Sequence, residues 1–189
     1  MKFFGNHFIV FLLPAILMLT MAIGGYFYLI DEESNESTNA TLQENIDWDA
    51  NERGTLIEVA WEWPSMPTDG MFGDDYIGVK GPIENVYLEL HASDGVLYEA
   101  DGEQVDNGWI VSFPNRLEEN RSLGNRGSVY IELTSSEYSA EDLDLFLLHT
   151  WSEHSPLELE DASFEDPSFG EALSVPHWVE EIEVASYVR

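Results

Sequence analysis

The sequence predicts an all-β domain, an antiparallel β-sandwich, that follows an N-terminal transmembrane helix. Three observations lead to this prediction. Residues 3–30 contain no Asp, Glu, Lys or Arg, and most of them form one apolar run. From Thr55 onward, apolar and polar residues alternate with a period of two, which is the period of a half-buried strand. Turn-forming Gly, Asn and Pro residues separate these short alternating segments, as they do in all-β proteins.

The apolar run 8–30 is long enough to cross a membrane as a helix. It would span roughly 34 Å, against about 30 Å for the hydrocarbon core of a bilayer. Lys2 is the only basic residue before the run, and acidic residues crowd the segment that begins at Asp31. Because positive charge is retained on the cytoplasmic side, we expect residues 1–7 in the cytoplasm. The rest of the chain would lie outside, as in a single-pass protein of the cell membrane.

A cleaved signal peptide is the alternative to an uncleaved signal anchor. The small residues of Ala22-Ile23-Gly24 have the spacing that signal peptidase requires. Cleavage there would leave the apolar segment 25–30 on the mature N-terminus, and the run exceeds the roughly 7–15 residues of a typical signal core. The uncleaved anchor is therefore the prediction, and both alternatives export the domain.

The exported part of the chain is acidic and contains no cysteine. The whole sequence has 37 Asp and Glu residues against 7 Lys and Arg residues, a formal net charge of −30. Since phosphate recognition depends on Lys and Arg, we expect no nucleic-acid partner. Without disulfides the fold has to rest on its own core, for which 6 Trp, 8 Tyr and 10 Phe supply side chains.

Residues 31–54 are expected to form an acidic, flexible stalk between the membrane and the domain. The segment is rich in Asp, Glu, Asn, Ser and Thr, and it has few apolar residues. Leu42 and Ile46 would allow one turn of amphipathic helix. Asn39-Ala40-Thr41 matches the N-glycosylation sequon, which has a meaning only in a secreted eukaryotic protein.

Residues 55–189 are expected to form the extracytoplasmic β-sandwich. In the first strand, 55–63, the side chains of Ile57, Val59 and Trp61 share one face. The next strands are predicted at 76–80, 83–91, 96–100, 109–113 and 128–134, with a polar loop at 114–127.

The second half of the domain contains one ambiguous segment, 139–151, which has both helical and alternating spacing. Ser139 and Asp142 resemble a helix-capping box. Because strands dominate the surroundings, we expect a single turn at 139–142 that leads into a strand. The last strand is predicted at 181–188, after a long loop at 152–179 that is rich in Pro, Glu and Asp.

An immunoglobulin-like sandwich is the first choice among the β-sandwiches. Eight short strands with frequent turns are typical of that architecture. Asp142, followed by Phe146 and Leu148, is similar to the loop-to-strand corner of such domains, with Phe and Leu where Tyr and Cys would stand. This likeness concerns the fold alone and carries no function.

A calcium-loop pattern predicts a metal site at Asp47, Asp49, Asn51 and Glu58. Ca²⁺ prefers carboxylate and amide oxygens at alternating loop positions, followed by a bidentate Glu. The position that requires Gly holds Glu52, however, and the final Glu falls within the first predicted strand. Weak Ca²⁺ binding is thus the only metal interaction expected, a solvated stalk is the alternative, and no cofactor is predicted.

Arg116, Arg121 and Arg126 form a local basic patch in this anionic chain. They supply half of the basic residues that follow the apolar run. We expect such a patch either to bind a protein or envelope-polymer partner or to pair with Glu118 and Glu119 within a surface loop.

No catalytic residue is predicted. The chain has no Cys nucleophile, no Gly-x-Ser-x-Gly and no phosphate-cradling Gly loop. His149 and His154 lack a metal-ligand spacing, and most Trp residues alternate with core positions. The expected function is a membrane-anchored, extracytoplasmic binding or assembly module without enzymatic activity. The alternatives are a carbohydrate-binding module or glycoside-active enzyme, and a structural envelope protein.

Overall fold

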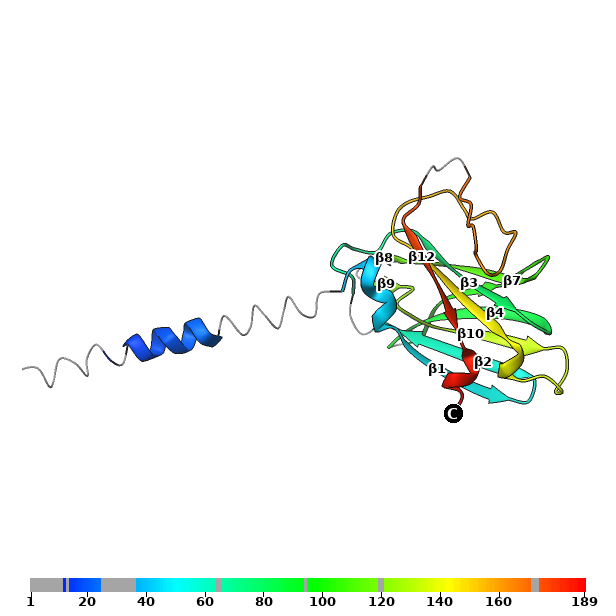
Figure 1. Ribbon diagram of the computed structural model, residues 1–189, viewed down its shortest axis with the longest axis horizontal. Helices are drawn as coiled ribbons and strands as arrows, with labels where there is room; N and C mark the ends of the chain where they lie inside the picture. The colour runs from blue at the N-terminus through cyan, green and yellow to red at the C-terminus, as the bar shows by residue number, and fades with distance from the viewer. Residues whose placement is uncertain are drawn as a thin grey trace, which may run out of the picture. The chain divides into compact units, whose positions relative to one another are not determined.

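The computed structural model of the chain describes residues 12, 14–24, 37–63, 66–93, 95–118, 121–170 and 174–189. The chain divides into two compact units, Met1–Glu36 and Ser37–Arg189, and the second unit holds the described strands (Figure 1). Residues 12 and 14–24 are helical, while the rest of the predicted span 8–30 lies outside the described residues. In the described part of the chain, no helix is both long and apolar enough to cross a membrane.

The second unit is built from two five-stranded antiparallel sheets that share one hydrophobic core (Figure 1). Sheet A has the order β1 (Asp47–Arg53), β2 (Leu56–Glu62), β10 (Arg126–Leu133), β4 (Ile83–Ala92), β5 (Gly95–Asp101). Sheet B has the order β12 (His177–Ile182), β11 (Asp144–Thr150), β3 (Asp74–Lys80), β7 (Gly108–Pro114), β6 (Glu103–Val105). The smaller elements are β8 (Arg116–Glu118), β9 (Arg121–Leu123), and the 3₁₀ helices η1 (Asn39–Asn45), η2 (Ala140–Asp142) and η3 (Val184–Tyr187). The predicted all-β, antiparallel sandwich is therefore confirmed.

The core lies between the two sheets, where the period-two alternation of the sequence places it. On β2, Ile57 and Val59 are fully buried and Trp61 is nearly so. The Trp61 indole N–H donates to the Gly124 carbonyl, at 2.9 Å. Its ring lies directly over Gly127, where a Cβ would come within 2.6 Å of it. A glycine is required at that position because the ring occupies the space of any side chain.

The outer face of sheet B is covered by the long connection between β11 and β12. A second hydrophobic cluster joins sheet residues, such as Phe146 and Leu148, to Leu157 and Phe164 of that connection. The covering chain comes so close to β3 that a Cβ on Gly78 would clash with the Ala162 carbonyl. The predicted loop 152–179 is thus a packed layer over most of its length. Its contact explains why both faces of β11 are buried.

The prediction of a flexible stalk over 31–54 is wrong from residue 39 onward. Residues 39–45 form η1, whose Leu42 is fully buried, and 47–53 form β1, which pairs with β2 along its whole length. Only Ala50 of β1 is buried, so the strand carries too few apolar residues to show the alternation. Residues 31–36 lie outside the described residues.

The other strand predictions are confirmed, although the short strand β6 was not predicted and two further corrections apply. Six predicted strands between residues 55 and 134 match observed strands to within two residues at each end, and the turn at 139–142 leads into β11 as expected. The polar loop 114–127 contains the strand pair β8–β9. The last strand lies at 177–182 instead of 181–188, because residues 184–187 turn into η3 and bury Val184 from there.

Candidate functional site

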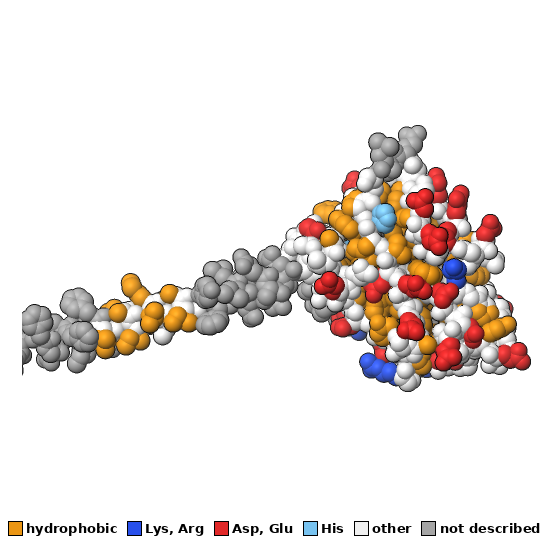
Figure 2. Space-filling model, viewed as in Figure 1, with side chains coloured by type: hydrophobic (Ala, Val, Ile, Leu, Met, Phe, Trp, Pro, Cys, Tyr) orange, Lys and Arg blue, Asp and Glu red, His pale blue; other side chains and the backbone are white. Residues whose placement is uncertain are grey.

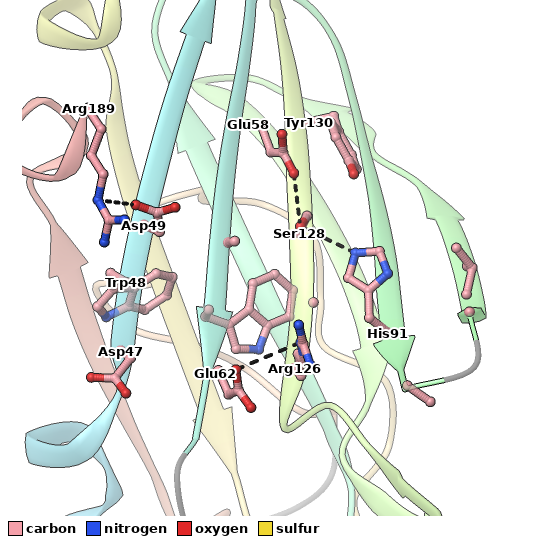
Figure 3. Close-up of a pocket in the computed structure, with 16 residues that line it drawn as sticks. Asp47, Trp48, Asp49, Glu58, Glu62, His91, Arg126, Ser128, Tyr130 and Arg189 are labelled. Carbon is pink, nitrogen blue, oxygen red and sulfur yellow. Dashed lines mark hydrogen bonds and ion pairs between the residues drawn. The ribbon is translucent and has the colours of Figure 1, made fainter.

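A shallow hollow of about 760 Å³ lies on the outer face of sheet A (Figure 3). Small side chains on neighbouring strands create it, since Ala60 of β2 lies directly opposite Ser128 of β10. Longer side chains surround this floor. They come from five segments: Asp47 and Asp49 of β1, Glu58 and Glu62 of β2, Arg126 and Tyr130 of β10, His91 of β4, and the C-terminal Arg189.

The lining of the hollow is acidic overall, although each arginine has a carboxylate partner. The Arg189 Nε lies 2.9 Å from the Asp49 carboxylate, and the Arg126 Nε lies 3.8 Å from that of Glu62. Both pairs are at least half exposed, so water screens them and each contributes little to stability. The wider surface has the same character, since Figure 2 shows many carboxylates and few basic side chains on the visible face.

Ser128 links two titratable side chains across the floor of the hollow. Its hydroxyl donates to the Glu58 carboxylate at 3.4 Å and lies 3.3 Å from Nε2 of His91 (Figure 3). A nucleophilic serine and its base lie within about 2.6–3.2 Å of each other, whereas both contacts of the Ser128 hydroxyl are longer. The arrangement offers hydrogen-bonding groups to a ligand rather than an activated nucleophile.

A pair of tyrosines extends this surface toward β4. The rings of Tyr87 and Tyr130 stack with centroids 4.5 Å apart and planes 12° from parallel. The Tyr130 hydroxyl donates to the Glu89 carboxylate at 3.3 Å. Burial, together with the nearby charges of Glu58 and Glu89, raises the pKa of Tyr130 to about 12. Its hydroxyl therefore stays neutral at ordinary pH and remains a hydrogen-bond donor.

The predicted calcium ligands line the edge of this face, but they lack the geometry of a calcium loop. Asp47, Asp49 and Asn51 point outward along β1, and Glu58 lies opposite Asn51 on β2. Alternate residues of a strand lie about 7 Å apart along an extended chain, which does not curve around an ion as a calcium loop does. Among the described residues, no group of three or more Asp, Glu or His side chains is placed to hold a metal. The pattern thus lies on a strand instead of in a loop, and Ca²⁺ binding by these residues stays a prediction.

The three arginines of the predicted patch lie at one end of the sandwich but on different elements. Arg126 lines the hollow, whereas Arg116 and Arg121 lie on the β8–β9 pair. Arg116 forms exposed ion pairs with Asp74 at 3.8 Å and Glu118 at 3.7 Å. The alternative of local pairing with Glu118 is thus confirmed for Arg116, and the partner-binding role of the patch stays a prediction.

Sequence reasoning missed a buried polar network around His149. His149 and Asp75 are fully buried, and His149 Nδ1 lies 2.9 Å from the Asp75 carboxylate. His149 Nε2 lies 3.0 Å from Oδ1 of Asn39. Because the Asn39 amide nitrogen donates to Asp69 and Gly70, its oxygen is the acceptor and His149 Nε2 carries a proton. The network fastens the beginning of the second unit to β3 and β11 of sheet B.

Three tryptophans close this network off. The rings of Trp63, Trp151 and Trp178 have centroids 5.3, 5.6 and 4.8 Å from that of His149. The His149–Asp75 pair therefore cannot contact a substrate, and its role is structural. The sequence feature that could have revealed this pair is the polar residue His149, which follows Leu145 and Leu147 on the inward-facing side of β11. The sequon at Asn39 is buried in the same network, with its amide nitrogen already bonded.

Glu180 is a second inward-facing polar residue near this network. It lies on β12, opposite Leu147 and between the inward-facing Trp178 and Ile182. Its Oε2 is buried and accepts no hydrogen bond from a described residue. Burial raises the pKa of Glu180 to about 7, because an ionised carboxylate is poorly solvated there.

Comparison of the sequence with protein-family models and with curated proteins gives no match. The geometry of the hollow and of the face around it is therefore what indicates a function.

Proposed function

We propose that the chain is a membrane-anchored, extracytoplasmic binding or assembly module without enzymatic activity. Its folded unit is an immunoglobulin-like sandwich, and its ligand or partner binds the outer face of sheet A. The N-terminal run 8–30 is the single-pass anchor, with residues 1–7 in the cytoplasm.

The strand order supports the immunoglobulin-like assignment. Such domains place their first, second, fifth and fourth strands in one sheet and their third, sixth and seventh in the other. Here β1, β2, β10 and β4 are consecutive in sheet A, and β3, β11 and β12 are consecutive in sheet B. The strands β5–β7 are then an insertion between the fourth and fifth strands, and they lengthen both sheets.

The observation that carries the binding role is the contrast between the two outer faces. The chain covers the outer face of sheet B with its own apolar side chains, among them Leu157, Phe164 and Phe169. The outer face of sheet A keeps an open hollow that is rimmed by hydrogen-bonding groups and two arginines. A sheet face with small residues in its centre and polar groups on its rim offers a partner both space and specific contacts.

The absence of enzymatic activity is supported by how the chemical groups are used. The His149–Asp75 pair is sealed in the core, and the Ser128 hydroxyl lies 3.3 Å from His91 and 3.4 Å from Glu58, farther than a nucleophile lies from its base. A carbohydrate is a second candidate partner, because aromatic rings such as the stacked pair Tyr87–Tyr130 and nearby carboxylates also contact sugars. The test below distinguishes it from a protein.

Site-specific photo-crosslinking of the full chain in its own membranes tests the binding face. A photoreactive residue at Glu62, on the rim of the hollow, is expected to crosslink a partner. The same residue at Tyr138, which is 40% exposed outside the hollow, is the matched control. Glu58→Arg should abolish the crosslink without changing the thermal unfolding curve. Equal crosslinking at both positions, or a crosslink that persists in Glu58→Arg, would contradict the assignment. Digestion of the product with protease or glycosidase separates a protein partner from an envelope glycan.

A further inference from the structure

The chain enters the sandwich at one end, which we call the Ser37 end. The Ser37 carbonyl accepts the backbone N–H of Thr68 at 2.9 Å, and Asn39 is bonded to the adjacent loop. β2 ends here at Glu62, opposite Arg126 at the start of β10. Sheet B also extends to this end. Its paired residues Asp74 and Pro114 lie here, because the Pro114 carbonyl is next to Gly124, in the segment that leads into β10.

Exposed apolar side chains concentrate at this end. In the described part of the second unit, five large hydrophobic side chains are at least 40% exposed, and four of them belong to the Ser37 end: Met66, Phe72, Val96 and Leu117. The fifth, Tyr138, lies at the opposite end, after β10.

Contacts between the loops place the four residues on the same end. The Met66 sulfur accepts a hydrogen bond from Ser122, which is the register partner of Leu117 in the β8–β9 pair. Phe72 precedes Gly73, whose carbonyl accepts the N–H that immediately precedes β8. Val96 lies at the turn between β4 and β5, near the start of β10.

Basic side chains accompany the apolar ones. Arg116, Arg121 and Arg126 all belong to β8, β9 or the start of β10, at this same end. The ion pairs of Arg116 and Arg126 are long and about half exposed, so a lipid phosphate can replace either carboxylate at little cost. Apolar side chains beside arginines are typical of surfaces that insert into the lipid interface.

The segment between the predicted anchor and Ser37 is short, which indicates that this end faces the membrane. The predicted anchor ends at Ile30, and seven peptide steps from there to Ser37 extend at most roughly 25 Å. The Ser37 end is therefore held within reach of the headgroups of the membrane that contains the anchor.

We propose that Met66, Phe72, Val96 and Leu117 insert into the lipid interface, with the neighbouring arginines at the phosphates. This contact would hold the domain against the bilayer by its Ser37 end. Val96 and Arg126 lie where this end meets the hollow, and the groups farther along sheet A, such as Asp49, Glu58 and Ser128, would stay available to a partner. The proposal rests on the proposed membrane anchor. A second copy of the chain is a poorer occupant of this surface, because the large negative charge of the domain opposes self-association.

Lipid-contact quenching tests the proposal on the full chain. Since the chain contains no cysteine, Leu117→Cys, Phe72→Cys and the control Tyr138→Cys each provide one labelling site for an environment-sensitive fluorophore. The labelled proteins are reconstituted into phosphatidylcholine vesicles with and without interface-brominated lipid. We expect at least twofold quenching at positions 117 and 72 and none at 138. Arg116→Glu in the Phe72→Cys protein should weaken the quenching.

The outcomes separate this proposal from the anchor itself. Protein that floats with the vesicles but is quenched equally little at all three positions overturns the lipid contact and leaves the anchor standing. Protein that fails to float overturns the anchor and this proposal together. Lipid-independent energy transfer between two labelled chains at position 117 would show that a second copy covers the surface, and would also overturn the proposal.

Discussion

Glu180 provides the sharpest prediction for stability. Its side chain faces the core from β12, and burial raises its pKa from 4.5 to about 7. The folded protein therefore binds this proton more tightly than the unfolded chain does. The resulting stabilisation is fully present below about pH 4.5 and is lost as the pH rises through about 7. Glu180→Gln keeps the shape of the protonated carboxyl group and removes its titration.

The size of the effect follows from the shift in pKa. Each pKa unit corresponds to about 1.4 kcal/mol, so a fully shielded Glu180 would contribute about 3 kcal/mol. Because the side chain is partly solvated, we expect the Gln variant to be more stable than the parent by on the order of 1–2 kcal/mol at pH 8. The two proteins should be equally stable near pH 4, where Glu180 is protonated in both the folded and the unfolded state. The melting temperatures at pH 8 should then differ by roughly 2–8 °C.

Urea unfolding at several pH values between 4 and 8 measures this difference, with the fluorescence of the 6 tryptophans as the signal. Glu181→Gln is the matched control, because Glu181 is the exposed neighbour of Glu180 on the same strand. The control should not change the slope of stability with pH. Parallel curves for the parent and Glu180→Gln would refute the assignment of a buried, unpaired carboxyl group.

Three further changes test other parts of the fold. Asn39→Ala removes the acceptor of His149 Nε2 and leaves that N–H buried without a partner, so urea unfolding should show a loss of about 2–4 kcal/mol. Gly78→Ala places a methyl group against the Ala162 carbonyl, and limited proteolysis should cut the covering segment at least tenfold faster than in the parent. Asp161 accepts four hydrogen bonds, three from Ser163 and Glu165 and one from Asn107. Burial alone would raise the pKa of Asp161, but these hydrogen bonds outweigh burial and lower it. Its stabilisation is therefore present above about pH 4 and lost below it, so Asp161→Ala should cost about 1–3 kcal/mol at pH 7 and much less at pH 3.

The core of the sandwich could be predicted because its strands obey the simplest rule of sheet burial. On β2, alternate apolar residues face the other sheet, and the pattern identifies the strand and its inward face together. β1 shows where that rule stops. It is an edge strand with one buried residue, and its polar outer face has the composition of a solvated stalk. Edge strands are held by their backbone hydrogen bonds, which leave no mark on the choice of side chains.

The candidate sites were harder to predict, because they depend on pairs far apart in the chain. His149 lies 110 positions from Asn39 and 74 from Asp75, and nothing in their local sequence links them. The hollow on sheet A depends on the register that brings Ala60 opposite Ser128. Asp47, Asp49 and Asn51 were singled out by a loop pattern that a strand also satisfies, since both place ligands at every second residue.

Accessibility of two introduced cysteines in intact cells tests the central claim most directly. Tyr138→Cys reports whether the domain lies outside, and Asp49→Cys, on the rim of the hollow and about half exposed, reports whether the face of sheet A is occupied. The account predicts that a membrane-impermeant maleimide labels position 138 in intact cells. It also predicts that position 49 is protected there and becomes reactive in the purified protein. An unreactive position 138 in intact cells, or a position 49 that reacts equally fast in both settings, would contradict it.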